Sequence, residues 1–152
     1  MIATLTAVRP IISELLTAPG SLDERLQSVC DYIQRELPKY DWVGFYWADH
    51  DTKTLHLGPY AGEPTDHTEI PFGKGICGQV AMSNENFVVP DVTAQDNYIA
   101  CSITVKAEIV VPIFKNGKNV GQIDIDSSTI DAFHQEDEDF LTWVCDQVSH
   151  QL

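Results

Sequence analysis

Positive charge is scarce in this sequence, and no long apolar run occurs in it. Lysine and arginine account for 9 of the 152 residues, against 23 aspartates and glutamates, so the formal net charge is −14. Such a charge repels phosphate backbones and anionic lipid surfaces. No segment approaches the roughly 20 apolar residues of a membrane span, and no basic stretch followed by an apolar one begins the chain. We therefore expect a cytoplasmic protein with no nucleic-acid or membrane partner.

The cysteine and histidine spacings of a metal site are also missing. The four cysteines, at positions 30, 77, 101 and 145, include no C-x-x-C pair, which excludes a zinc ribbon and a thioredoxin-type motif. The five histidines have no ligand spacing such as H-x-x-x-H. In a reducing compartment the thiols should be free, and any disulfide should be transient.

Length and composition suit one globular domain that contains several helices. Hydrophobic residues make up 43% of the chain and charged residues 21%, an ordinary globular balance. Helical periodicity predicts a first helix over about 5–16, weakened by Pro10, a second that follows a capping box at Ser21 and runs to residue 37, and a last one over about 135–150. Cys30 and Cys145 lie in the apolar stripes of the last two helices, so we expect both to be core cysteines.

Strand patterns occupy the segments between these helices. Residues 42–47 and 54–58 are rich in β-favouring side chains, and 108–114 and 119–126 flank Asn116-Gly117, a type I′ turn sequence. The evident connections are hairpins and not helical crossovers, so the sequence predicts an α+β fold with an antiparallel sheet. We expect the helices near 22–37 and 135–150 to pack together on one face of that sheet.

Alternation along residues 119–126 predicts that two carboxylates share one face of the sheet. Val120, Gln122, Asp124 and Asp126 point to one side, and the residues between them should face the helices. Neighbouring like charges raise one another's pKa, more so when water is excluded. An ordinary solvated polar face produces the same pattern, so the pattern leaves both interpretations open.

Two further cysteines and an aromatic pair are candidates for chemistry. Cys77 follows a glycine-rich turn and should lie near the start of a short helix, which lowers a thiol pKa; a buried structural cysteine is the alternative. Cys101 lies in a long aperiodic segment, 90–106, of the kind that is often functional. Trp42 and Tyr46 share one face of their strand and either line a pocket or fill a core.

Six segments occur in an order that is far more specific than any one of them. They are Asp41-Trp42-Val43-Gly44-Phe45-Tyr46, Leu57-Gly58-Pro59-Tyr60, Ile70-Pro71-Phe72-Gly73-Lys74-Gly75-Ile76-Cys77-Gly78, Ile99-Ala100-Cys101, Glu108-Ile109-Val110-Val111-Pro112 and Asp124-Ile125-Asp126-Ser127. From about residue 41 to the final helix, the sequence resembles the free methionine-(R)-sulfoxide reductases. The resemblance implies that residues 1–152 form a single GAF domain, with helices on one face of an antiparallel sheet and a ligand pocket on the other.

The resemblance assigns roles to the two candidate cysteines. Cys101 matches the family's catalytic cysteine, and Cys77 matches a second cysteine of its redox set. The family typically has a third, resolving cysteine ten residues before the one matching Cys77, where this sequence has His67. The implied reductant is thioredoxin-like, no metal or organic cofactor is required, and family members often form homodimers.

The resemblance also assigns a substrate site. Glu108, Asp124 and Asp126 match acidic residues that bind the sulfoxide and the amino group, and Trp42 and Tyr46 match residues that help to wall the pocket.

The assignment of Glu108 sets a geometric condition on the hairpin. A two-residue Asn-Gly loop pairs Lys115 with Lys118, and a regular ladder then places Glu108 opposite Ile125, away from the face of the two aspartates. A bulge is therefore needed to bring Glu108 into the pocket.

Two classes of function follow from these residues. One is an oxidoreductase that reduces free L-methionine-(R)-sulfoxide through a cysteine thiolate, with a sulfenic acid and disulfide cycle. The alternative is a non-catalytic GAF domain that binds a small molecule or senses redox state. The fold is common to both, so the fold by itself does not choose between them.

Overall fold

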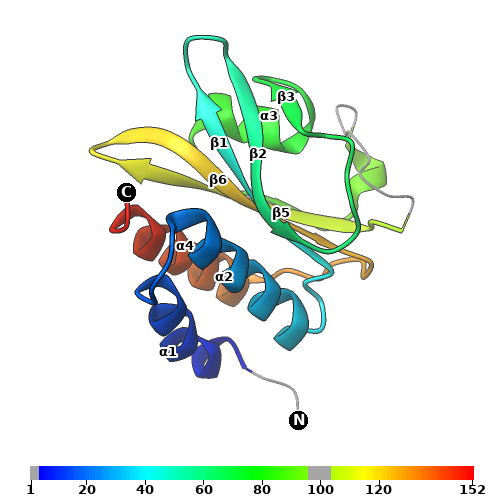
Figure 1. The fold of residues 1–152 in the computed structure, drawn as a ribbon. Coiled ribbons are helices and arrows are strands. Elements are labelled where there is room, and N and C mark those ends of the chain that lie inside the picture. The colour runs from blue at the N-terminus through cyan, green and yellow to red at the C-terminus, as the bar shows by residue number, and fades with distance from the viewer. Residues whose placement is uncertain (1–3, 96–103) are drawn as a thin grey trace.

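A twisted antiparallel sheet separates two layers of the chain (Figure 1). The computed structural model describes residues 4–95 and 104–152, and in this part the sheet has six strands in the order β3-β2-β1-β6-β5-β4. The strands are β1 (Trp42–Asp49), β2 (Thr54–Ala61), β3 (Glu69–Pro71), β4 (Phe87–Val89), β5 (Ala107–Lys115) and β6 (Lys118–Ser127). The predicted α+β class and antiparallel sheet are confirmed. The sequence did not predict β3 and β4, which are three residues long each.

Three helices lie on one side of the sheet (Figure 1). They are α1 (Leu5–Leu16), α2 (Leu22–Glu36) and α4 (Gln135–Ser149), and α1 packs against both of the others. The predicted capping box begins α2: Ser21 Oγ accepts from the backbone N–H of Glu24 at 3.2 Å, and the Ser21 N–H donates to Glu24 Oε1 at 3.1 Å. Two of the orphan N–H groups of the first turn are thereby satisfied.

The larger hydrophobic core lies between these helices and the sheet. Ile33 of α2, Phe45 of β1 and Phe140 of α4 are fully buried in it. Cys30 and Cys145 belong to the same core, with 0% and 4% of their surface exposed. Their prediction as core cysteines is confirmed, and burial raises the pKa of both thiols.

The opposite face of the sheet has a cover of its own. Helix α3 (Gly75–Ser83) packs on β5 and β6, as Figure 1 shows above the sheet. Where α3 meets the sheet there is a second apolar cluster, to which α3 contributes Ile76 and Val80 and the sheet contributes Tyr46 and Val110. This face is therefore a closed core along part of its length, and only the remainder is available for a pocket.

The hairpin between β5 and β6 contains the bulge that the assignment of Glu108 requires. Asn116 and Gly117 have φ values of 52° and 77°, as a type I′ turn requires, and Lys115 pairs with Lys118. Beyond the turn the register shifts by one residue: Phe114 pairs with Asn119, but Ile113 pairs with Gly121.

Val120 is the residue left without a partner by this register shift. It packs against the helix-side core, so its prediction on the face of the carboxylates is wrong. The shift carries the rest of the ladder with it, and Glu108 pairs with Asp126. The bulge therefore puts Glu108 on the same face as the two aspartates.

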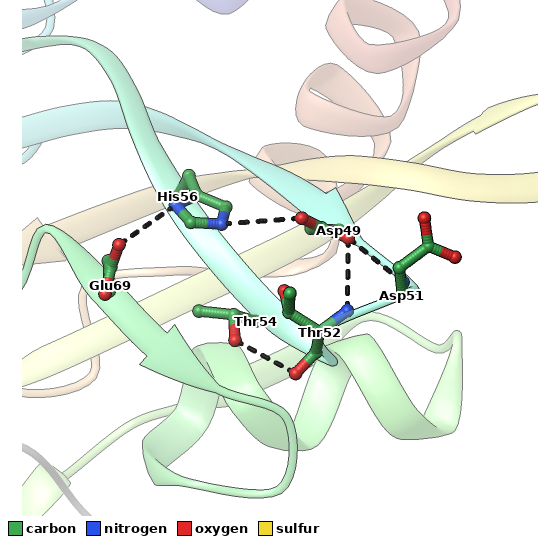
Figure 2. Close-up of polar contacts among 6 residues, drawn as sticks. All are labelled: Asp49, Asp51, Thr52, Thr54, His56 and Glu69. Carbon is green, nitrogen blue, oxygen red and sulfur yellow. Dashed lines mark hydrogen bonds and ion pairs between the residues drawn. The ribbon is translucent and has the colours of Figure 1, made fainter.

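The turn joining β1 and β2 is fixed by side-chain contacts (Figure 2). Asp49 Oδ1 accepts from the backbone N–H groups of Asp51 and Thr52, at 3.0 and 3.2 Å. These hydrogen bonds, led by that from Thr52, lower the pKa of Asp49. The His56 ring lies 3.9 Å from Asp49 and 3.5 Å from Glu69, so it connects the turn to β3. The His56, Asp49 and Glu69 side chains of this network are exposed.

Within residues 4–95 and 104–152, every helix falls short of the length and apolarity needed to cross a membrane.

Candidate functional site

Three buried carboxyl groups share the sheet face opposite α1, α2 and α4. Glu108 on β5 and Asp124 and Asp126 on β6 are 5%, 1% and 2% exposed. The predicted orientation of the two aspartates away from the helix-side core is therefore confirmed, and the alternative of a solvated polar face is wrong. Three ionised carboxylates in so little water would repel one another strongly, so the cluster favours retaining a proton.

Burial raises the pKa of Asp124 above its usual value. Hydrogen bonds with Glu108 and with the thiol of Cys77, together with the charge of His67, act in the opposite direction without cancelling the effect of burial. A hydrogen bond between two carboxyl groups requires a proton on one of them. The Glu108–Asp124 pair is thus suited to hold a proton that it can donate.

Helix α3 places the thiol of Cys77 beside these carboxyl groups. Cys77 is the third residue of α3, and its Sγ donates to Glu108 Oε2 at 3.8 Å. Burial, and then the charges of Asp124, Glu108 and Asp126, raise the pKa of this thiol well above its ordinary range. The predicted lowering by the helix N-terminus is wrong, because desolvation and three nearby carboxylates outweigh the helix dipole.

An aromatic wall stands next to the carboxyl cluster. Trp42 and Tyr46 lie on the same face of β1, as predicted, with ring centroids 6.4 Å apart, and Trp42 stacks on Tyr60 at 5.4 Å. Gly44 lies between them in the strand, and a Cβ there would approach Trp42 Cη2 to 2.3 Å. The absence of a side chain at Gly44 is what lets the indole lie flat across the strand. Trp42 Nε1 donates to the backbone oxygen of Glu63 at 3.0 Å, which fixes the orientation of the ring.

Two hollows meet this cluster. The larger, of about 340 Å³, has Asp41, Trp42, Glu63 and Asp126 among its lining residues, and its size is typical of a small-molecule site. The smaller, of about 10 Å³, is bounded by Tyr46, His67, Ile70, Lys74, Gly75, Ile76, Cys77, Glu108 and Asp124, and it has room for about one water molecule. Asp126 and Trp42 therefore face a ligand-sized pocket, and Cys77, Glu108, Asp124 and Tyr46 face a void of atomic size.

His67 is a site residue that sequence reasoning treated only as a missing thiol. It lies between β2 and β3, and its backbone oxygen accepts from the Tyr46 hydroxyl at 2.9 Å. His67 borders the same void as Cys77 and Asp124. Two further residues were missed: Gln122, whose Nε2 donates to the backbone oxygen of Cys77 at 3.1 Å, and Glu63. Gln122 could have been found from its place in the alternation with Asp124, whereas Glu63 lies in a loop with no such signal.

Cys101, the candidate catalytic cysteine, lies outside the described residues, as do residues 96–103 as a whole. The predicted approach of Cys101 to Cys77 therefore stays a prediction. On either side of that segment, Gln95 and Thr104 are described, and Thr104 and Val105 belong to the lining of the larger pocket.

Known proteins resemble both the sequence and this architecture. Residues 20–151 match the model of the GAF domain family. The free methionine-R-sulfoxide reductase of Escherichia coli is 32% identical over 91% of this chain and 82% of its own length. The enzyme of the same name from Saccharomyces cerevisiae is 44% identical over 66% of this chain, and the match spans 57% of that protein. The structure of free methionine-R-sulfoxide reductase from Neisseria meningitidis, in complex with its substrate, superposes with a TM-score of 0.92 at 29% identity, over 99% of this chain and 93% of that one.

Proposed function

The chain belongs to the GAF domain family, and within it to the free methionine-R-sulfoxide reductases; on that premise we propose that it reduces free methionine-(R)-sulfoxide to methionine. The protein is accordingly an oxidoreductase. The observation that carries the proposal for this chain is a set of buried groups at one sheet face. Asp126 lines a pocket of about 340 Å³, and Glu108, Asp124 and the Cys77 thiol border a void of about 10 Å³ on the same face. These groups are a proton source, an anionic binding surface and a redox-active sulfur in one place.

The pocket supports a free amino acid as the substrate. A free amino acid carries an ammonium group, and carboxylates are its natural partners through charge-assisted hydrogen bonds. Asp126, with Asp41 and Glu63 nearby in the lining, supplies such partners. The ring of Trp42 supplies an apolar wall for the substrate side chain, and Tyr46 packs behind that ring. A methionine sulfoxide within a peptide has neither this ammonium group nor a free end to enclose.

The proposed chemistry begins at Cys101. Its thiolate attacks the sulfoxide sulfur while one proton is added to the sulfoxide oxygen. The oxygen is then transferred to the Cys101 sulfur as its bond to the substrate sulfur and the bond between the two sulfurs break, which releases methionine and leaves Cys101 as a sulfenic acid. The Glu108–Asp124 pair is our candidate donor, because these two carboxyl groups share a hydrogen bond and burial favours the protonated form of Asp124. Asp126, which lines the larger pocket, then binds the substrate amine.

Cys77 is the proposed resolving thiol. Its sulfur attacks the sulfur of the Cys101 sulfenic acid, which forms a disulfide and releases water, and a thioredoxin-like dithiol reduces that disulfide back to two thiols. The raised pKa of the reduced Cys77 thiol means that it must lose its proton during this step. A carboxylate left by the first proton transfer, at Glu108 or Asp124, is within reach to accept it. One cycle converts the sulfoxide and two thiols into methionine, a disulfide and water.

A single-turnover assay of released methionine tests these roles. Cys101→Ser should abolish even the first turnover, because the hydroxyl is too weak a nucleophile. Cys77→Ser should release about one methionine per chain and then stall with thioredoxin as the reductant. A Cys77→Ser variant that cycles at the wild-type rate would remove Cys77 from the mechanism, and comparable rates on free and peptide-bound methionine sulfoxide would contradict the enclosed pocket.

His67 favours a second candidate function, a GAF domain that binds a metabolite or senses redox state without turnover. The family's usual resolving thiol is absent at this position. If Cys77 does not replace it, wild type should stall after about one turnover with thioredoxin, a small thiol should restore cycling, and His67→Cys should raise the thioredoxin-supported rate. No methionine from wild type, together with tight binding of an amino acid, would support the binding domain. Light scattering of the same preparations tests the expected homodimer.

A further inference from the structure

The geometry points to a second capacity at this face: we propose that Cys77, Glu108 and Asp124 form a binding site for one divalent cation of the Zn²⁺ type. The three residues come from α3, β5 and β6, and one ligand atom from each lies within 4.8 Å of the other two. Around a tetrahedral Zn²⁺ with bonds of the usual length, a sulfur and an oxygen ligand stand about 3.5–3.7 Å apart. Cys77 Sγ and Glu108 Oε2, at 3.8 Å, are already close to that spacing.

Two further observations point to a ligand at this cluster. Asp124 is 1% exposed, yet its Oδ1 makes no hydrogen bond within residues 4–95 and 104–152. Buried carboxylate oxygens normally have a partner, so an orphan oxygen calls for one. The void that Asp124 borders with Cys77 and Glu108 has a volume of about 10 Å³, which suits a single small particle.

The donor set selects the kind of cation. Zn²⁺ accepts thiolate, imidazole and carboxylate together, whereas Mg²⁺ and Ca²⁺ take oxygen ligands. A thiolate and two carboxylates supply the negative charge, and His67 is among the residues that border the same void. Lys74 also borders the void and opposes a cation, but it is exposed and its charge is screened by solvent. When the ion binds, the thiol proton and the proton shared by the carboxyl groups leave to solvent.

Such an ion would inhibit the reduction of methionine sulfoxide, and this consequence rests on the proposed function. A metal-bound Cys77 cannot attack a sulfenic acid, and metal-bound Glu108 and Asp124 cannot supply a proton. Removal of the ion by a chelator would restore all three groups.

Binding is tested by titrating the reduced protein with Co²⁺, a spectroscopic substitute for Zn²⁺. We expect one ion per chain, a thiolate-to-Co²⁺ absorption band in the near ultraviolet, and displacement of the Co²⁺ by Zn²⁺. Cys77→Ser should remove the band and weaken Zn²⁺ binding by at least about 100-fold, the upper end of what the loss of a mere outer partner costs. The matched control is Cys30→Ala in the helix-side core, which should bind as wild type does.

Several results would contradict the proposed cation site. A band that survives in Cys77→Ser, or one that disappears in Cys101→Ser, would assign the sulfur ligand elsewhere. If Cys77→Ser does not fold, X-ray absorption of Zn²⁺ on wild type decides, because the proposal requires one sulfur neighbour and the rest nitrogen or oxygen. Inhibition of turnover should follow the same Zn²⁺ dissociation constant in wild type and in Cys30→Ala. Binding without any reductase activity would defeat the proposed function and leave the site standing, whereas activity without binding would do the reverse.

Discussion

Gly44→Ala tests whether the position of the Trp42 ring decides substrate binding. A Cβ at residue 44 would lie 2.3 Å from Trp42 Cη2, 2.5 Å from Cζ3 and 3.0 Å from the Cβ of Tyr60. Carbon atoms in favourable contact are about 3.5–4.0 Å apart, so the indole must move by roughly 1 Å or more. Overpacking of this kind costs about 1–3 kcal/mol. The displaced ring would also lose its alignment with Tyr60 and with the backbone oxygen of Glu63.

Urea denaturation and steady-state kinetics measure the two consequences. We expect the free energy of unfolding to fall by about 1–3 kcal/mol. KM for free methionine sulfoxide should rise more than kcat falls, because Trp42 lines the larger pocket and takes part in none of the proposed steps of bond formation or proton transfer. The control is the same substitution in a Trp42→Leu background, where the two clashing ring atoms are gone.

The double-mutant cycle decides whether the reasoning holds. If the added methyl group acts through the indole, the two substitutions should couple by about 1 kcal/mol or more, since residues in direct contact show interaction energies of about 0.5–3 kcal/mol. An equal loss of stability in both backgrounds, or an unchanged KM in Gly44→Ala, would refute the role given to the Trp42 ring.

Two further substitutions and one deletion distinguish the site from the scaffold. Because the pKa of Asp124 is raised in the folded protein, folding is coupled to the uptake of a proton by this side chain. The protonated side chain contributes to the free energy of unfolding in full below the pKa of an unfolded aspartate, about 3.9. This contribution is lost as the pH rises through the folded-state pKa. Asp124→Asn should therefore gain stability relative to wild type as pH rises in urea unfolding series, and parallel pH profiles would contradict this. Deletion of Val120 should remove the bulge and turn Glu108 into the helix-side core, so that thermal unfolding by circular dichroism shows severe destabilisation; a stable, active deletion would disprove the role of the bulge. Ile33→Val should cost about 0.5–1.5 kcal/mol and leave kcat/KM unchanged, since Ile33 is buried on the other side of the sheet; a large change in kcat/KM would mean that the two faces are coupled.

Local patterns in the sequence determined the scaffold and part of the site. The capping box at Ser21 located the start of α2, and Asn116-Gly117 located the hairpin, because caps and tight turns depend on a few adjacent residues. Alternation placed Asp124 and Asp126 on one face and Trp42 and Tyr46 on one face, because the period of two is a property of any extended strand. Helical stripes in the same way assigned Cys30 and Cys145 to the core.

Only the tertiary structure decided which of the site residues are adjacent and how they shift one another's pKa. The bulge at Val120 places Glu108 on the face of the aspartates and not on the helix face. A bulge depends on the pairing of both strands along their length, so the alternation of residues within one strand does not predict it. The docking of α3 brought Cys77 against three carboxyl groups and reversed the expected direction of its pKa, since desolvation and charge depend on residues distant in sequence. For the same reason, the sequence showed His67 only as the place of a missing cysteine, whereas the fold places it at the same void as Cys77 and Asp124.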